Sequence, residues 1–401
     1  MQIYDIVIIG GGIVGLSTAM KMSQKYPDLK IAVIEKEDDF ALHQTGHNSG
    51  VIHAGIYYKP GSQKGNFCYA GSKELRKYCD FKGIEYELCG KLIVATNTKE
   101  LGMLKELHSR GLANGVDGLR MIDKDEIKEI EPYASGLGAL HSPNTGIVDY
   151  RLVAKSYAED AGKQGVDLYT SCQFIGYKLI NGKTYLNTTQ GDFQTEWTIN
   201  CGGLYADKIA GKMDVDSDTR IIPFRGEFYS ITPEKSSMIK GLIYPVPQPE
   251  LPFLGVHFTK RIDGTIEAGP NAVLAFAREG YRKTDVNMID LVEYLRFSGF
   301  WRMSATHWKT GIGEQWRSLF KKVFAKSLQK LVPDIKEEDL CNPSAGVRAQ
   351  AVSFRGEIVQ DFKILPGPKS IHVLNAPSPA ATASLIIGEE IAHNAKANFG
   401  I

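Results

Sequence analysis

The first forty residues alternate between short apolar runs and a segment with helical spacing. Residues 4–9 (YDIVII) form an apolar run typical of a buried strand, and residues 31–34 (IAVI) form a second one. Between them, LSTAM at 16–20 continues with helical spacing. The pattern therefore predicts a strand, a helix and a second strand at the start of the chain.

The pattern of apolar positions predicts mixed elements over the rest of the chain. Helices are expected at about 67–82, 99–113 and 151–164, and strands near 86–88, 91–95, 166–170 and 197–200. Two further runs, 174–179 and 184–188, form a predicted hairpin through Asn181-Gly182. Strands punctuated by proline follow over 221–269, helices over 285–331, strands at 358–364 and 370–374, and a last helix at 379–398.

A glycine-rich turn joins the first strand to the first helix. Gly10, Gly12 and Gly15 form a G-x-G-x-x-G pattern, and the second strand ends at Glu35, about twenty positions after the last glycine. The first glycine allows the turn, the second lets the backbone approach a pyrophosphate, and the third lets helix pack on strand. The carboxylate is placed to meet a ribose. We therefore predict a dinucleotide-binding cradle, and no second one occurs later in the chain.

These elements predict an α/β fold of two domains. A Rossmann-like dinucleotide-binding domain is expected to be discontinuous, built from 1–85, 145–220 and 340–401. A second domain with an antiparallel sheet is expected from 86–144 and 221–339, where it would hold the substrate.

Composition narrows the class of protein. With 47 Lys+Arg against 46 Asp+Glu in 401 residues, the net charge of +1 argues against a nucleic-acid partner. The six cysteines are scattered without a CxxC pair, which favours reduced thiols in a cytoplasmic protein over metal or redox spacing. The N-terminus does not resemble a signal peptide, and no apolar run reaches the ~18 residues of a membrane span. The oligomeric state is not defined by the sequence.

Residues 41–66 are rich in glycine, histidine and asparagine without a clear period, which predicts a loop. Its centre, Thr45–Gly55, contains small residues and backbone donors that suit close approach to a planar ring system. His43 and His47 have i,i+4 spacing, but Gly46 argues against a helix there, so no metal site is predicted. A histidine titrates near neutral pH and suits a base that accepts a hydroxyl proton. A hydrogen-bonded loop residue is the plainer interpretation.

Three later segments could also approach a cofactor or substrate. NCGGLYA at 200–206 ends a strand in paired glycines and opens a helix. NAPSPAAT at 375–382 places Ser378 as N-cap and Pro379 as first residue of the last helix, whose positive end could face a flavin. Arg348, on the predicted AGVR turn, and Arg225, in PFRGE, are candidate carboxylate anchors, with Arg261 as a further one.

Residues 296–330 carry eight Lys or Arg against Glu314 alone, together with Trp301, Trp308 and Trp316. From Trp316 to residue 331 the apolar positions form one helical stripe. A stripe packed on the core beneath a solvated basic face is the favoured interpretation. Contact with an anionic membrane surface is the alternative, and it would allow electrons to pass to a membrane quinone.

Several blocks carry a resemblance to a known family. TGHNSGVIHAGIYYKPGS, PFRGE, PFLGVH, GPNAVLAFAREGYRK, AGVRAQAVS and NAPSPAAT resemble the L-2-hydroxyglutarate dehydrogenase/oxidase family. That family lies within the D-amino-acid oxidase/glycerol-3-phosphate dehydrogenase superfamily of FAD proteins. The likeness runs from about Tyr4 to the final helix.

The resemblance implies FAD as cofactor and assigns its site. Arg348 would hold the substrate anion, with Arg225 for the second carboxylate of a small dicarboxylate, and His53 would act as the base with His257 as its rival. The residues implied around FAD are Gly10, Gly12, Gly15, Glu35, Lys36, Thr45, Asn48, Ser49, Gly50, Phe174, Gly202, Gly203, Ser378, Ala380, Ala381 and Thr382.

The implied reaction is oxidation of L-2-hydroxyglutarate to 2-oxoglutarate by hydride transfer from C2 to flavin N5. The base takes the C2 hydroxyl proton, and the electrons pass on to quinone or oxygen. An amine or D-amino-acid oxidase on the same scaffold is the nearest alternative. A flavoprotein that modifies tRNA or has no catalytic role is the second. The protein is expected in the cytoplasm or peripherally on the inner membrane.

Overall fold

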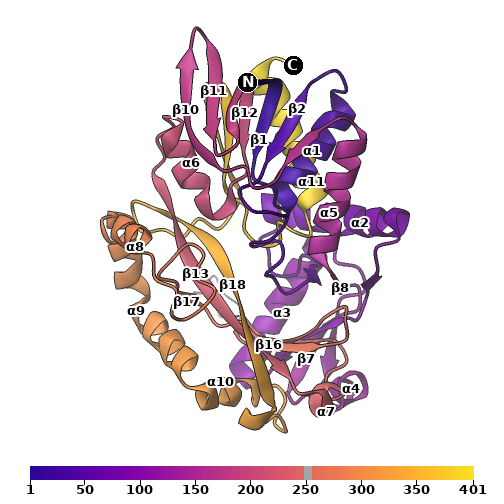
Figure 1. Ribbon diagram of the computed structural model, residues 1–401. Helices are drawn as coiled ribbons and strands as arrows, with labels where there is room; N and C mark the ends of the chain where they lie inside the picture. The colour runs from indigo at the N-terminus through magenta and orange to yellow at the C-terminus, as the bar shows by residue number, and fades with distance from the viewer. Residues whose placement is uncertain (248–254) are drawn as a thin grey trace.

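The molecule contains two large sheets, one at each end (Figure 1). The computed structural model describes residues 1–247 and 255–401. The first three residues of the PFLGVH block lie outside the described residues. Both chain termini lie beside the first sheet, at the top of Figure 1.

The first sheet has eight strands with β1 at its centre. β1 pairs in parallel with β2 and β12, β2 pairs with β9, and β12 also pairs with β20. Helices α1, α5 and α11 pack against it through one apolar core (Figure 1). The bounds are β1 Gln2–Ile9, α1 Ile13–Lys25, β2 Ile31–Ile34, α5 Tyr150–Lys163, β9 Asp167–Tyr169, β10 Phe174–Ile180, β11 Lys183–Thr188, β12 Gly191–Asn200, α6 Ala206–Lys212, β19 Lys363–Gly367, β20 Ser370–Asn375 and α11 Ser384–Phe399.

The second sheet has nine strands, mainly antiparallel. Helices α8 to α10 run along one flank, at the left of Figure 1, and the apolar core beneath α10 is separate from that of the first sheet. The bounds are β5 Lys91–Ala95, α3 Thr98–Ala113, β6 Arg120–Asp123, α4 Lys124–Ile130, β7 Gly138–Ser142, β13 Thr219–Ile231, α7 Pro233–Ser236, β14 Leu242–Pro245, β15 His257–Lys260, β16 Ile266–Gly269, β17 Val273–Leu274, α8 Met288–Leu295, α9 Ser298–Leu319, α10 Lys321–Leu328 and β18 Leu340–Ser353.

Between the two large sheets lies a three-stranded sheet, with α2 nearby (Figure 1). Its strands are β3 Val51–Ile52, β4 Tyr86–Glu87 and β8 Gly146–Val148, and α2 covers Gln63–Lys82. Short 3-10 turns occur at Gly203–Tyr205 and Glu337–Asp339. Residues 41–66, expected as one loop, therefore contain β3 and the start of α2.

Most expected elements are confirmed, and the exceptions have identifiable causes. Asn181 and Gly182 both adopt positive φ, as the hairpin turn requires. Residues 340–353, expected with the dinucleotide-binding domain, instead form β18, which pairs along β13 in the second sheet. The AGVR segment is accordingly strand rather than turn. The strand expected at 358–364 is observed at Lys363–Gly367.

The last helix begins later than its local capping signals predict. α11 starts at Ser384, and residues 378–383 form successive turns instead. The Ser378 hydroxyl lies 3.3 Å from Nε2 of His53 and caps no helix. A contact from the distant segment after β3 thus replaces the predicted local one.

Candidate active site

A large cavity, of about 970 Å³, runs from the glycine turn after β1 to the face of the second sheet. Its volume is at the upper end of the range for ligand pockets, ~300–1,000 Å³. Both large sheets contribute to its walls, and the segment 41–58 and the turns at 376–382 complete them. The cavity can therefore hold an extended molecule that reaches from one sheet to the other.

The glycine turn has the geometry of a phosphate cradle. A Cβ on Gly15 would lie 2.0 Å from the Gly10 carbonyl oxygen, so only glycine lets α1 pack this closely on the turn. Gly12 is the N-cap of α1 and provides no side chain to its amides. Thr45 Oγ1 accepts from Ile13 N at 3.0 Å, which joins the segment after β2 to the start of α1. The positive end of α1 faces the cavity at Gly12.

Glu35 directly follows β2, beside this cradle. Its carboxylate accepts from the amide of Gly11 at 2.7 Å and from that of Glu37 at 3.0 Å, which fixes its direction. Lys36 forms ion pairs with Glu37 and, at 2.7 Å, with Glu279. Glu35 and Lys36 both line the cavity.

The structure brings together most of the predicted cofactor residues. Gly15 and Gly50 do not line the cavity, and each is instead needed for close backbone packing, Gly50 against the Val148 carbonyl. The predicted cofactor residues that line it are Gly10, Gly12, Glu35, Lys36, Thr45, Asn48, Ser49, Phe174, Gly202, Gly203, Ser378, Ala380, Ala381 and Thr382. The cradle, the fixed carboxylate and the length of the cavity fit an FAD molecule.

Both predicted histidines line the cavity, His257 on β15 of the second sheet and His53 directly after β3. Nδ1 of His257 lies 2.8 Å from the Gly255 carbonyl oxygen, which can only accept, so Nδ1 carries the proton and Nε2 is the acceptor in the neutral ring. The ring stacks on Tyr244 with centroids 3.7 Å apart. Burial, reinforced by the positive charges of Lys91 and Arg348, lowers the pKa of His257 to about 3. The imidazole is thus held neutral.

His53 follows β3 and lies opposite the 376–382 turns. Its amide donates to Thr382 Oγ1 at 3.1 Å, and its Nε2 lies near the Ser378 hydroxyl. Burial, with contributions from Lys91 and His257, holds the pKa of His53 well below its usual range. Both histidines are therefore neutral at working pH.

The two predicted arginines differ in position. Arg348, on β18, lines the cavity, and burial lowers its pKa from the usual value. Arg225, on β13, is not among the described residues that line the cavity. Its guanidinium donates to the Glu227 carboxylate at 3.0 and 3.1 Å and to the Arg282 carbonyl. The expectation that Arg225 holds a second carboxylate is therefore corrected: Glu227 already neutralises it.

The wall also contains residues that the sequence did not single out. Tyr57 and Tyr58 lie in the HAGIYY block but carry no chemical signal by type, and Tyr244 lies on β14 without any motif. Tyr150 donates to the Val51 carbonyl at 2.9 Å and contacts Thr382 Oγ1 at 2.8 Å. Long-range strand pairing, which a single sequence does not reveal, places these side chains together.

A model of the FAD dependent oxidoreductase family matches residues 5–394. The L-2-hydroxyglutarate dehydrogenase of Indibacter alkaliphilus is 50% identical over 397 residues, covering 99% of this chain and all of that protein. The human mitochondrial L-2-hydroxyglutarate dehydrogenase is 45% identical, covering 99% of this chain and 89% of the relative. The chain belongs to the L-2-hydroxyglutarate dehydrogenase family of FAD-dependent oxidoreductases.

Solved structures agree with this family in fold. The L-alpha-glycerophosphate oxidase of Mycoplasma pneumoniae, solved with FAD bound, matches with a TM-score of 0.80 at 24% identity, covering 98% of this chain and 95% of that one. A glycine oxidase from Geobacillus kaustophilus matches with a TM-score of 0.71 at 16% identity, covering 98% and 94%. FAD is the cofactor of this family member, an oxidoreductase.

Among the described residues, no helix is long and apolar enough to cross a membrane.

Proposed function

We propose that this protein oxidises L-2-hydroxyglutarate to 2-oxoglutarate. The observation that carries the proposal is the cavity itself, which joins a dinucleotide cradle to a wall with a neutral histidine and an arginine. The Escherichia coli K12 relative, 44% identical over 389 residues, is also named L-2-hydroxyglutarate dehydrogenase. Oxidation of a 2-hydroxy acid needs both the arginine, which anchors its carboxylate, and the histidine, which accepts its hydroxyl proton.

The protein side chains bind the substrate and move its proton. Arg348 matches a carboxylate with two parallel hydrogen bonds and would hold the C1 carboxylate of the substrate. His257 then receives the C2 hydroxyl proton on Nε2, while its Nδ1–H keeps donating to the Gly255 carbonyl oxygen. When bound, FAD supplies the acceptor for the hydride that leaves C2.

His257 is favoured over His53 as the base because of its orientation. Its ring is held from two directions, by the Gly255 carbonyl and by the Tyr244 ring, and its proton-accepting nitrogen is the unanchored one. Nε2 of His53 already lies 3.3 Å from the Ser378 hydroxyl. His53 would therefore contribute to the shape of the wall and to its hydrogen bonding.

An anaerobic titration of the purified FAD protein tests the reaction. L-2-hydroxyglutarate should bleach the oxidised-flavin absorbance and release 2-oxoglutarate, and the D enantiomer should leave the absorbance unchanged. A flavin that stays oxidised with both enantiomers contradicts the proposed substrate, and bleaching by both contradicts the stereochemistry.

Two matched variants test the assignment of the base. His257→Asn keeps a donor for the Gly255 carbonyl but removes Nε2, so flavin reduction should slow by roughly 10²- to 10⁴-fold. His53→Asn should slow it by less than roughly 10-fold. The opposite ranking would assign the base to His53.

The outer face of α8 and α9 supports a peripheral position on a membrane. Trp301, Trp308, Ile312, Trp316 and Leu319 lie along one stripe of α9 and are each more than half exposed. By contrast, the lower part of the predicted stripe, including Phe324 and Leu328 on α10, is buried in the core. The core-packing interpretation therefore fits α10, and the exposed stripe of α9 supports the membrane proposal.

Basic residues border this exposed stripe, among them Arg302 and Lys309. Indole rings beside Lys and Arg are typical of protein surfaces that lie at the headgroup level of anionic bilayers. We therefore propose that α8 and α9 rest on such a bilayer and that electrons leave the flavin for a membrane quinone.

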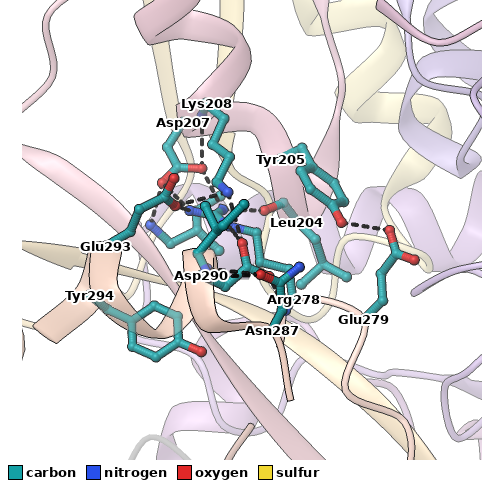
Figure 2. A network of polar contacts seen from close by, with 12 residues as sticks. Leu204, Tyr205, Asp207, Lys208, Arg278, Glu279, Asn287, Asp290, Glu293 and Tyr294 are labelled. Carbon is teal, nitrogen blue, oxygen red and sulfur yellow. Dashed lines mark hydrogen bonds and ion pairs between the residues drawn. The ribbon is translucent and has the colours of Figure 1, made fainter. Parts of the chain in front are cut away.

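A buried ion network holds this surface in a fixed position. Arg278 contacts Asp207 of α6 at 2.6 and 3.0 Å, and its backbone amide donates to Asp290 of α8 at 2.9 Å (Figure 2). Lys208 pairs with the same Asp290 at 2.8 Å. α8 is thereby fastened to α6, which lies beside the first sheet (Figures 1 and 2).

Flotation of the FAD protein with phosphatidylglycerol-containing vesicles tests the membrane position. Replacing Trp308 and Trp316 by serine should abolish flotation. Phe81→Ser is the matched control, because Phe81 is 81% exposed on α2, away from this stripe. Equal flotation of the double variant and wild type would contradict the proposal.

A further inference from the structure

Lys91, on β5, is a buried lysine at the edge of the active site. Its side chain is only 2% exposed. Its Nζ lies 4.1 Å from the centre of the Tyr244 ring and 5.2 Å from that of Tyr57. Both tyrosines line the cavity, so the amine lies immediately behind its wall.

Lys91 has no acidic partner among the residues that the structure describes. The groups that interact with it electrostatically are the thiols of Cys68 and Cys89 and the imidazoles of His53 and His257. Lysine is almost never fully buried without a counter-ion, because removing the ammonium from water costs several kcal/mol. Burial accordingly lowers the pKa of Lys91 to about 7. Such an amine gains its charge fully only when an anion arrives.

The proposed substrate brings two carboxylates, and one lacks an assigned partner. Arg348 lines the cavity and suits the C1 carboxylate. Arg225 is paired with Glu227 outside the cavity wall. Lys64 also lines the cavity, but it lies at the start of α2, is partly exposed and is influenced by Asp361.

We propose that Lys91 supplies the positive charge by which the cavity selects a substrate with a second carboxylate. The inference rests on the proposed function, since it concerns the specificity of the same site. The C5 carboxylate would lie beside Tyr57, on the side away from Lys91, because the stacked His257 ring already covers the other face of Tyr244. The tyrosine rings separate the ammonium from water, and the ammonium attracts the carboxylate through this wall of low dielectric constant.

The expected effect follows from the distance. A ligand on the far side of the Tyr57 ring is about 8–9 Å from Nζ, the 5.2 Å between Nζ and the ring centre plus roughly one van der Waals contact. At an effective dielectric constant of about 20, a unit charge at that distance changes carboxylate binding roughly 25-fold. The binding of a substrate with a neutral end at the same place does not depend on the charge of the ammonium.

Two substrates with the same five-carbon skeleton distinguish an effect of charge from an effect of shape. L-2-hydroxyglutarate carries the C5 carboxylate, whereas L-2-hydroxyvalerate ends in a methyl group. In the FAD enzyme, Lys91→Met should lower kcat/KM for L-2-hydroxyglutarate roughly 25-fold and leave that for L-2-hydroxyvalerate within about twofold. Lys91→Arg should retain most of the preference. An equal loss with both substrates would overturn the inference.

Lys64→Met tests the rival cation directly. If Lys64 holds the C5 carboxylate, this variant will lose the preference for L-2-hydroxyglutarate and Lys91→Met will retain it, which overturns the inference. Lys260→Met is the matched control on β15, which β14 separates from β5, and its ammonium is already paired with Glu87 at 2.7 Å. It should leave the preference unchanged.

A binding measurement makes the inference independent of turnover. Glutarate and valerate are titrated into the FAD protein, and binding is followed by the shift in flavin absorbance. Glutarate should bind wild type roughly 25-fold more tightly than Lys91→Met, with valerate binding equally to both. If wild type is not reduced by L-2-hydroxyglutarate but shows this glutarate dependence, the proposed function fails and the inference stands. Equal glutarate affinity in wild type and Lys91→Met overturns the inference.

Discussion

Replacing Lys91 by methionine is expected to stabilise the folded protein at neutral pH, although the change removes a charge from the active site. Methionine has a similar length and no charge, and the surroundings of Lys91 contain no carboxylate among the described residues that would be left unpaired. The substitution therefore removes the cost of a buried ammonium without creating another buried charge.

The magnitude follows from the pKa of the amine. Burial lowers it from 10.5 to about 7, and each pKa unit corresponds to about 1.4 kcal/mol. Below pH 7 the lysine is charged in the folded and the unfolded chain, so the full cost, about 5 kcal/mol, is present. Between pH 7 and 10.5 the unfolded chain binds more protons, so wild-type stability rises with pH. The advantage of Lys91→Met therefore falls to about 2 kcal/mol at pH 9.

Thermal unfolding at pH 6 and pH 9 measures this difference. An unfolding entropy of about 2.1 cal/mol/K per residue gives roughly 0.8 kcal/mol/K for 401 residues. Lys91→Met should then raise Tm by about 6 °C at pH 6 and by about 2 °C at pH 9. Lys260→Met, which removes a partly exposed paired charge, should shift Tm by less than about 1 °C at both. A Tm below that of wild type at pH 6, or a gain that does not shrink at pH 9, refutes the reasoning.

Three further results are expected. Gly15→Ala should abolish FAD retention, measured as bound flavin per chain, because its Cβ would lie 2.0 Å from a backbone oxygen; Gly162→Ala, with its nearest contact at 3.7 Å, should retain the full flavin content. Arg278→Met should lower the free energy of unfolding in urea by about 3–5 kcal/mol, since it leaves the buried Asp207 without its partner; a loss under 1 kcal/mol would contradict the role of the network. Because burial lowers the pKa of His257 to about 3, this base stays neutral as the pH falls through 6.5 and is protonated only near pH 3. The acid limb of kcat/KM should lie below pH 5, and a limb near 6.5 would argue against His257.

Locally encoded features could be predicted from the sequence. The glycine turn needs only a strand, three glycines and a helix within fifteen residues, and its backbone geometry depends on those residues alone. The hairpin at Asn181-Gly182 is similar, because positive φ at two adjacent residues is a property of the residues themselves. The resemblance in contiguous blocks then identified the cofactor, and the family match agrees with it.

Local signals failed where a distant contact competed with them. Ser378 and Pro379 have the chemistry of a helix start, but the Ser378 hydroxyl contacts His53 and α11 begins at Ser384. Arg225 has the chemistry of a carboxylate anchor, but alternate residues of a strand share a face, so Glu227 on β13 meets its guanidinium first. The pairing of Arg225 with Glu227 could have been predicted from their i,i+2 spacing once the segment was predicted as a strand.

The sequence by itself determined that the chain holds a dinucleotide, because phosphate recognition uses backbone amides within one short turn. Only the tertiary structure decided what faces the substrate. Tyr57, Lys91, Tyr244 and His257 come from four segments, and the pairing of β14 with β5 and β15 brings the last three together. A lysine acquires an unusual pKa only when such long-range pairing removes it from water and from every acidic partner, and no local pattern encodes that.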